Sequence, residues 1–163
     1  MQANGHNDHM FSGLLQLIRP LNVLIVGAAV ILGLHLGGGE GHWVVWIFGP
    51  LAAMLVTAFA NIDNDLSDVA IDRINRPNRP LVSGRVSSRA AFVFSLTILT
   101  IALLSAGVCG KAALILAGGV AVWLVIYNRW AKRRLLIGNV MVAIAGGVPL
   151  VYAGILLEPL AGQ

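Results

Sequence analysis

Five stretches of this chain contain no Asp, Glu, Lys or Arg, and they restrict its fold more than any other feature. They hold 20, 22, 21, 17 and 23 residues, and the charged residues at their ends are Arg19 and Glu40, Glu40 and Asp63, Arg89 and Lys111, Lys111 and Arg129, and Arg134 and Glu158. A membrane-spanning helix needs about 17–25 predominantly apolar residues. The sequence therefore predicts an all-α fold, a polytopic transmembrane helix bundle of about five helices.

The composition excludes a soluble domain and a disordered chain. Apolar residues make up 58% of the 163 residues and charged residues 11%, whereas soluble domains have about 45–50% and about 25%. A small soluble domain cannot bury so much apolar surface, and disordered chains are poor in apolar residues. The formal net charge of +4 would suggest nucleic acid in a soluble chain. Here it indicates membrane topology, and we expect no nucleic-acid partner.

The basic residues are distributed unevenly between the expected loops. If successive stretches cross the membrane in alternate directions, 10 of the 11 Lys and Arg residues fall on one side and only Lys111 falls on the other. Lys and Arg accumulate on the cytoplasmic side of membrane proteins. We therefore expect a multi-pass protein of the cell membrane with its N-terminus and the segments 61–89 and 129–134 in the cytoplasm.

We expect one membrane domain over residues 1–163, which begins with a polar leader at Met1–Ser12. The leader lacks the basic start of a signal peptide, so the first apolar stretch is interpreted as a retained helix. Gly37–Gly41 is rich in glycine and predicts a flexible turn on the outer side.

A cluster of acids follows the second apolar stretch, where four of the seven acids fall within ten residues. Asn64, Asp68 and Asp72 are spaced i, i+4, i+8 and would share one helix face, with Asp65 beside it. Uncompensated carboxylates cost roughly 2.5–3.5 kcal/mol each at mid-bilayer, so the row predicts a bound cation. Oxygen ligands favour Mg²⁺ or Ca²⁺, and Mg²⁺ commonly combines one or two carboxylates with substrate phosphates. The alternative, a helix end in water, explains the acids but not their spacing.

The segment 73–89, rich in Arg, Pro and Ser, predicts the one long loop of the chain. Pro77 and Pro80 disfavour the helical conformation at the residues before them. The second helix should therefore end near Asp72–Asn75.

The arginines of this loop fall into two groups. Arg76 and Arg79 lie between prolines, which restrict the backbone, and an arginine fork matches the oxygens of a phosphate. These two are therefore candidates for phosphate binding. For Arg85 and Arg89 the preferred interpretation is membrane topology or contact with anionic lipid headgroups.

The segment from Asn64 to Gly84 reads N-D-x-x-D-x-x-x-D, then R-x-N-R-P-x-R-P-x-x-S-G. This pattern resembles the first aspartate-rich motif of the UbiA-type intramembrane prenyltransferases. Two further segments match in the right order. The residues 19–22 resemble the R-P-x-N at the start of the first helix of the family, and the residues 127–139 resemble its Y-x4-K and L-I-G-N segment.

The resemblance implies a magnesium-dependent enzyme that transfers a polyprenyl group from an allylic diphosphate to a membrane-associated acceptor. Asn64, Asp68 and Asp72 would hold the Mg²⁺ on the diphosphate, and Asp68 and Asp72 would be the catalytic residues. The remaining implied contacts with substrate are Arg79 and Lys132 for the diphosphate, Tyr127 for the prenyl chain, Arg19 and Asn22 for the acceptor side, and Asp65 and Arg76 close to the diphosphate.

Three of these residues have simpler interpretations. Tyr127 could instead be an aromatic residue at the membrane interface. Lys132 could instead be a cation that extends its side chain to that interface. Asn22 is also a residue type that forms hydrogen bonds between membrane helices. The extra acid Asp63 has no role in the motif.

Within the family, the R-I-N-R-P-N-R-P form most resembles the branch that transfers geranylgeranyl to geranylgeranylglycerol phosphate in the synthesis of ether phospholipids. Other branches prenylate quinone precursors, haem or chlorophyllide. Outside the family, the alternatives are a non-catalytic fragment and an ion-binding membrane protein. The latter would need acids at mid-membrane on several helices, whereas here they crowd the end of one.

The chain departs from the family in one respect. Family members are longer and carry a second aspartate-rich motif, but the only acid after Asp72 in this sequence is Glu158. We therefore expect the chain to correspond to the N-terminal half of the family fold. On this interpretation the isolated chain is inactive, and a C-terminal half is a missing partner.

Overall fold

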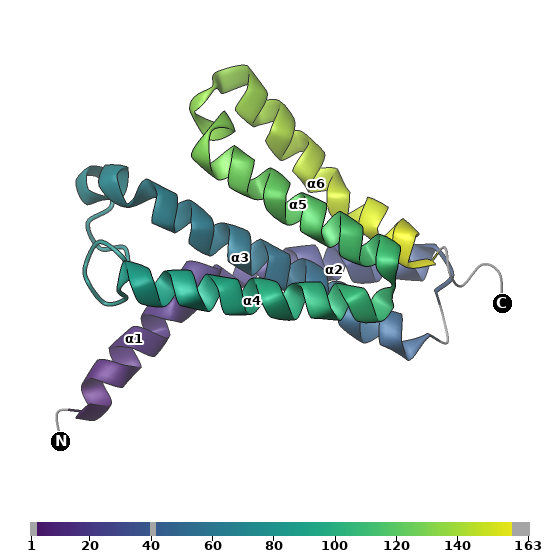
Figure 1. Cartoon of the computed structure of the whole chain (residues 1–163), viewed down its shortest axis with the longest axis horizontal. Helices are drawn as coiled ribbons and strands as arrows, with labels where there is room; N and C mark the ends of the chain where they lie inside the picture. The colour runs from purple at the N-terminus through teal and green to yellow at the C-terminus, as the bar shows by residue number, and fades with distance from the viewer. Residues whose placement is uncertain (1–2, 40–41, 158–163) are drawn as a thin grey trace.

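The computed structural model describes residues 3–39 and 42–157, and over these residues it is helical with no strand. The elements in chain order are α1 (Ala3–Ile18), α2 (Pro20–Leu36), α3 (Trp43–Asn75), α4 (Ser88–Cys109), α5 (Lys111–Arg129), the 3-10 helix η1 (Ala131–Arg133) and α6 (Leu135–Leu157) (Figure 1). In the described part of the chain, four helices are long and apolar enough to cross a membrane, and the bent pair α1 and α2 makes a fifth. The predicted all-α polytopic bundle of about five helices is confirmed.

Helix α3 lies at the centre of the bundle and is much longer than a membrane span requires. Its 33 residues extend about 50 Å at about 1.5 Å per residue, against about 30 Å for the hydrocarbon core. Asp63 is 20 residues after Trp43, so it lies about 30 Å along the helix. The acids of α3 are therefore held on a rigid extension at the edge of the apolar layer or beyond it.

The predicted end of this helix is confirmed, because α3 ends at Asn75, two residues before Pro77. The loop is shorter than the predicted 73–89 and covers residues 76–87. The loop ends earlier than predicted because Ser87 caps the N-terminus of α4. Its hydroxyl oxygen accepts a hydrogen bond from the backbone N–H of Ala90 at 3.1 Å, and this N-cap begins α4 at Ser88.

The predicted polar leader is largely helical, since α1 begins at Ala3. Helices α1 and α2 meet at an angle of 43° at Arg19, whose φ of 56° and ψ of 72° are left-handed. A left-handed non-glycine residue costs about 1–3 kcal/mol, and Pro20 is well suited to the first position of α2. Glu40 and Gly41 of the predicted outer turn lie outside the described residues, as does Glu158.

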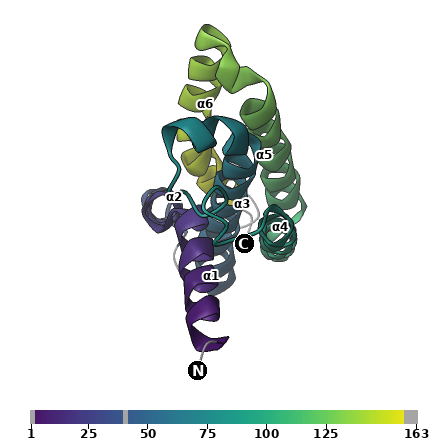
Figure 2. The ribbon, with the colours of Figure 1, turned by 90° about the vertical axis from the view of Figure 1, so that its left-hand side faces the viewer.

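Helices α5 and α6 form a hairpin that packs closely on the others at one end of the bundle and diverges from α3 and α4 at the other (Figures 1 and 2). We call this second end the polar end, defined by Arg19, residues 63–89 and residues 127–134. Two cavities lie against α3, one lined by residues of α2, α5 and α6 and the other by residues of α4, α5 and η1.

Small residues bring the helices together, as expected where helices pack in a membrane. Ala102 and Ala106 of α4 and Ala117 and Ala121 of α5 are buried. At the crossing of α2 and α6, a Cβ atom added at Gly33 would lie 2.6 Å from the Cβ of Ala153. This crossing therefore depends on the missing side chain at position 33.

Replacing Gly33 with leucine is expected to destabilise the bundle by about 1–3 kcal/mol, because overpacking a tight contact forces backbone shifts. The measurement is the midpoint of thermal unfolding in detergent. Gly147→Leu is the matched control, since a Cβ added at Gly147 of α6 meets no atom within 4 Å among the described residues. Equal midpoints for the two variants would contradict the close crossing of α2 and α6.

Candidate active site

The row of acids on α3 is covered by cations that come from three other segments. Asp65 accepts hydrogen bonds from Arg19 at 2.5 Å and from Arg79 at 2.9 Å, both at its Oδ1 atom. The same Nη1 atom of Arg79 lies 2.7 Å from Oδ2 of Asp72. Arg79 therefore bridges two carboxylates whose side chains are only 6% and 9% exposed.

Lys132 covers the rest of the row. Its Nζ atom lies 2.6 Å from Oδ1 of Asp68 and 3.2 Å from Oδ1 of Asn64. Two oxygens one helical turn apart thus converge on one cation. The lysine comes from η1, which follows α5 directly, so the end of the α5–α6 hairpin is tied to α3 at this point.

We call these seven residues the polar cluster: Arg19, Asn64, Asp65, Asp68, Asp72, Arg79 and Lys132. It contains three carboxylates and three cations, so its formal charge is zero. Each carboxylate is paired with at least one cation at 2.9 Å or less. Removing one member of such a group leaves an uncompensated charge in a poorly solvated place.

The loop 76–87 holds Arg79 rigidly. The carbonyl oxygen of Arg79 accepts hydrogen bonds from the N–H groups of Val82 at 3.0 Å and Ser83 at 2.8 Å. The next residue, Pro80, is fully buried, and so is Val86, which packs under Gly13 of α1. The guanidinium is therefore presented to α3 from an anchored turn rather than from a free loop.

The left-handed backbone at Arg19 lies next to the polar cluster. Asn61 of α3 donates a hydrogen bond from Nδ2 to the carbonyl oxygen of Ile18 at 2.8 Å. This contact holds the bend between α1 and α2 against α3 and brings the Arg19 side chain to Asp65. Arg19 therefore has a strained backbone and also belongs to the polar cluster. Residues with strained backbones are often found at functional sites.

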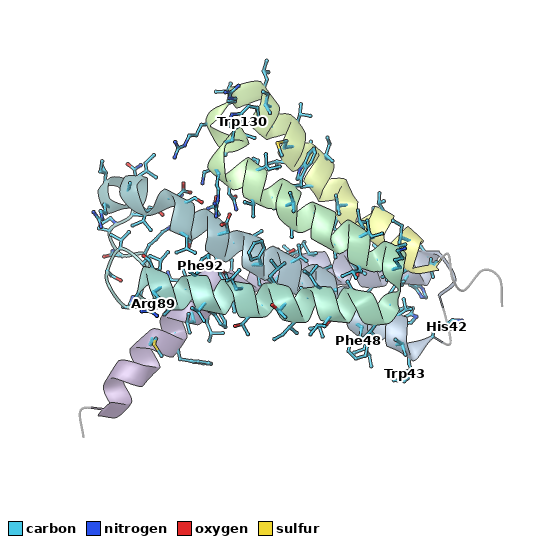
Figure 3. The ribbon with its side chains drawn as sticks, viewed as in Figure 1. His42, Trp43, Phe48, Arg89, Phe92 and Trp130 are labelled. Atoms are coloured by element: carbon cyan, nitrogen blue, oxygen red, sulfur yellow. The ribbon has the colours of Figure 1, made fainter. Side chains whose placement is uncertain are left out.

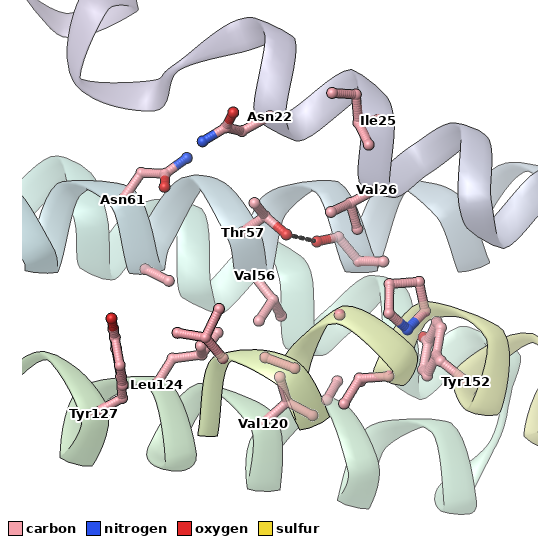
Figure 4. Close-up of a pocket in the computed structure, with 18 of the residues that line it drawn as sticks. Asn22, Ile25, Val26, Val56, Thr57, Asn61, Val120, Leu124, Tyr127 and Tyr152 are labelled. Atoms are coloured by element: carbon pink, nitrogen blue, oxygen red, sulfur yellow. Dashed lines mark hydrogen bonds between the residues drawn. The ribbon is translucent and has the colours of Figure 1, made fainter. Parts of the chain in front are cut away.

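An apolar cavity of about 450 Å³ begins beside the polar cluster and extends between α2, α3, α5 and α6. In the close-up, Asn22, Asn61 and Tyr127 lie toward one end and Tyr152 at the other, with Val56 and Val120 between (Figure 4). Asn61 is three residues before Asn64, and Tyr127 is five before Lys132. The end of the cavity with Asn61 and Tyr127 is therefore the end near the polar cluster.

The structure brings most of the predicted site residues together, but not all in the predicted groups. Arg19 lies on Asp65, whereas Asn22 lies on the wall of the apolar cavity with Tyr127. Arg76 is exposed and has no ion pair with any described residue. It lines a second cavity of about 550 Å³ together with Arg19 and Arg79.

The predicted magnesium ligands are divided between two cations. Asn64 and Asp68 share Lys132, and Asp72 contacts Arg79. Within residues 3–39 and 42–157, no group of three or more His, Cys, Asp or Glu side chains is arranged to hold a metal. The donors still fit magnesium, because Asn64 and Asp68 already direct two hard oxygens at one cation and Mg²⁺ takes its other ligands from substrate phosphates and water.

Asp63, which had no role in the sequence pattern, is a buried link between α3 and α5. Its Oδ2 accepts a hydrogen bond from Nδ2 of Asn128 at 3.0 Å, and its Oδ1 accepts one from Arg129 at 3.2 Å. Asn128 also donates to the carbonyl oxygen of Ala60 at 3.1 Å. Asn128 is four residues before Lys132, so this link sets where the lysine meets the acids. Nothing near Asp63 in the sequence indicates a partner 65 residues away.

The fold and the site together define a class of protein: a multi-pass helical membrane protein that holds a charge-balanced polar cluster beside an apolar cavity. The chain belongs to the UbiA prenyltransferase family, whose model matches residues 24–161.

Curated relatives agree with this assignment. The digeranylgeranylglyceryl phosphate synthase of Methanothrix thermoacetophila is 34% identical over 149 residues, which cover 90% of this chain and 55% of the relative. The protein of the same name from Thermococcus sibiricus is 35% identical over 144 residues, which cover 86% of this chain and 51% of the relative. The chain thus spans about half the length of the curated relatives it matches.

Two solved structures share the fold. One, from work on digeranylgeranylglyceryl phosphate synthase in membranes, has a TM-score of 0.86 and 29% identity, and the match covers 90% of this chain and 53% of that one. The other is a UbiA homologue from Archaeoglobus fulgidus bound to GPP and Mg²⁺, with a TM-score of 0.72 and 25% identity over 87% of this chain and 52% of that one.

Proposed function

We propose that this chain carries the diphosphate-binding site of a polyprenyl-transferring enzyme. The group transferred is geranylgeranyl, and the acceptor is geranylgeranylglycerol phosphate. The observation that carries the proposal is the position of the neutral polar cluster beside a cavity with an apolar lining. A prenyl diphosphate has the matching division into an anionic head and an apolar tail. The names of the relatives support geranylgeranylglycerol phosphate as the acceptor.

Arg79 and Lys132 are the residues that would hold the leaving diphosphate. Both now donate to carboxylates, and both side chains are largely shielded from solvent, at 17% and 14% exposure. On substrate binding they would donate to phosphate oxygens instead. Fixed cations in a poorly solvated site stabilise the negative charge that gathers on the leaving group as the allylic C–O bond breaks.

We further propose that Asn64, Asp68 and Asp72 hold magnesium. Asp68 and Asp72 would be the catalytic residues, because they would keep the ion at the diphosphate. When bound, the ion would supply positive charge to the departing diphosphate. The solved homologue bound to GPP and Mg²⁺ supports this cofactor. The proposed role of Asp65 is to keep Arg19 and Arg79 in position, and that of Arg76 is to attract the diphosphate from the exposed side.

The apolar cavity would hold the first part of the prenyl chain, with Tyr127 on its wall near the reacting carbon. Its volume of about 450 Å³ is in the range of small-molecule sites. Asn22 and Asn61, at the same end, are polar groups suited to orient the hydroxyl of the acceptor.

A binding experiment tests the proposal. The chain in detergent, with magnesium present, should bind geranylgeranyl diphosphate far more tightly than geranylgeraniol, as measured by calorimetry. Membranes that carry this chain together with the rest of a homologous enzyme should convert radiolabelled geranylgeranyl diphosphate and geranylgeranylglycerol phosphate to the diether product. Equal binding of the diphosphate and the alcohol would refute the diphosphate site, and transfer to an aromatic acceptor alone would refute the acceptor.

We also propose that the polar end faces the cytoplasm, as the distribution of Lys and Arg predicts. Single cysteines placed in a Cys109→Ser background at Asn78 or Arg134 should react with a membrane-impermeant maleimide only after the inner face is exposed. A cysteine at Gly38 should react in intact cells. Labelling of positions 78 and 134 from opposite faces would contradict the five-span arrangement.

A further inference from the structure

A second polar groove lies at the polar end, outside the polar cluster. It has a volume of about 620 Å³ and lies where α4 and α5 diverge over α3. Three arginines line it: Arg89 from the first turn of α4, Arg129 from the last turn of α5, and Arg133 from η1. We call it the arginine groove.

The arginine groove and the polar cluster lie on opposite faces of α3. Successive residues of an α-helix advance by about 100° around its axis. The α3 residues that line the groove, Asp63, Leu66 and Ser67, therefore lie within about 100° of one another, centred about 160° from the face of the polar cluster. The proposed diphosphate site cannot account for the groove.

The arginine groove has a surplus of positive charge. Among the described residues that line it, the only acid is Asp63, which pairs with Arg129 at 3.2 Å. Arg89 and Arg133 are exposed, and neither has an ion pair with any residue in the described ranges. The N-terminus of α4, which begins at Ser88, adds a partial positive charge at the same place. Two arginines thus remain available for an anion.

Part of the groove wall is apolar. Leu66 and Phe92 line it, and Phe92 is 50% exposed. Figure 3 shows Arg89 and Phe92 near the polar end of α4. The exposed residues Val93 and Leu96 continue this apolar surface along α4, away from the polar end. The groove therefore joins cationic side chains to an apolar surface.

The depth of the groove matches the headgroup layer of a membrane. Asp63 lies about 30 Å from the start of α3, which is the thickness of the hydrocarbon core. Arginine side chains at this level meet lipid phosphates, and basic pockets between membrane helices are known to bind anionic headgroups.

We propose that the arginine groove binds one anionic phospholipid, with its phosphate between Arg89 and Arg133 and an acyl chain along Phe92 and Leu96. A free phosphate would use the arginines but not the apolar wall. The bound lipid would hold together the diverging ends of α4 and α5, and so would brace η1, which carries Lys132.

The test compares variants of the whole chain in nanodiscs of phosphatidylcholine with a minor share of phosphatidylglycerol. Native mass spectrometry after release from the nanodiscs counts the lipids that stay bound. The wild-type chain should retain one phosphatidylglycerol in preference to phosphatidylcholine. The double variant Arg89→Ala/Arg133→Ala should lose this preference by roughly thirtyfold, the effect expected from removing two arginines near an anionic surface.

The matched control is Arg73→Ala/Arg134→Ala, which removes the same charge from the polar end. Arg73 and Arg134 do not line the groove, and Arg134 stacks on Trp130 at 4.0 Å. The control should keep the wild-type preference. An equal loss in both double variants would show that only general surface charge attracts the lipid, and release of the lipid by inorganic phosphate would show an anion site without a lipid specificity. Either result would overturn the proposal.

Discussion

Replacing Arg79 with alanine is expected to destabilise the chain by about 3–5 kcal/mol and to abolish binding of a prenyl diphosphate. One Nη1 atom of this arginine serves both Asp65 and Asp72, and the two carboxylates are almost fully buried. Breaking a buried ion pair by removing one partner costs about this much, because the remaining charge is uncompensated. Thermal unfolding in detergent measures the first effect and calorimetry with geranylgeranyl diphosphate the second.

Arg73→Ala is the control for Arg79→Ala, because Arg73 is exposed and has no ion pair with a described residue. Arg79→Lys should restore stability only in part, since the Nζ atom of lysine is one bond closer to the backbone than the Nη1 atom that bridges the two carboxylates. Wild-type stability in Arg79→Ala would show that Asp65 and Asp72 do not depend on Arg79 and that the polar cluster is not a balanced unit.

The membrane spans were predictable because charge is excluded from the hydrocarbon layer over a length that the bilayer sets. The stretch between Arg134 and Glu158, for example, is α6 from Leu135 to Leu157. The end of α3 was predictable for a different reason, since Pro77 restricts its preceding residue locally. The start of α4 was predicted less well. The predicted loop ran to residue 89, whereas the N-cap at Ser87 begins the helix at Ser88.

The polar cluster was predictable only in its periodic part. The spacing of Asn64, Asp68 and Asp72 places them on one face of α3, and local geometry is enough to show it. Their cation partners come from other elements. Lys132 is 64 residues from Asp68, so only the family resemblance indicated it. The resemblance grouped Arg19 with Asn22 on the acceptor side and did not show that Arg19 would pair with Asp65.

The role of Asp63 could not be predicted from its position in the sequence. This residue is adjacent to the cluster in sequence but on another helix face, and its partners Asn128 and Arg129 become apparent only when α5 is packed on α3. The proposed lipid groove depends on the same packing. Its arginines, Arg89, Arg129 and Arg133, are spread over 45 residues and line one groove only because α4 and α5 both pack on α3.

Removing magnesium is expected to weaken binding of geranylgeranyl diphosphate roughly 100-fold, within the usual range of coupling between two ligands. The charges of the polar cluster already balance one another, so a diphosphate alone would bring uncompensated negative charge and a divalent cation alone would bring uncompensated positive charge. Only the two together would keep the charge near balance while Arg79 and Lys132 exchanged carboxylates for phosphate oxygens as proposed. Calorimetric titrations with EDTA and with excess Mg²⁺ measure the ratio.

Two variants separate this coupling from a general need for divalent ions. Asp68→Ala removes a carboxylate that shares Lys132 with Asn64, so it should reduce the magnesium effect severalfold. Asp63→Asn leaves the polar cluster intact and should keep the full effect even where it lowers stability, because its partners lie on α5. If wild-type chain binds the diphosphate equally well with and without magnesium, Arg19, Arg79 and Lys132 alone neutralise the substrate. The acids of α3 would then serve only to hold these three cations in place.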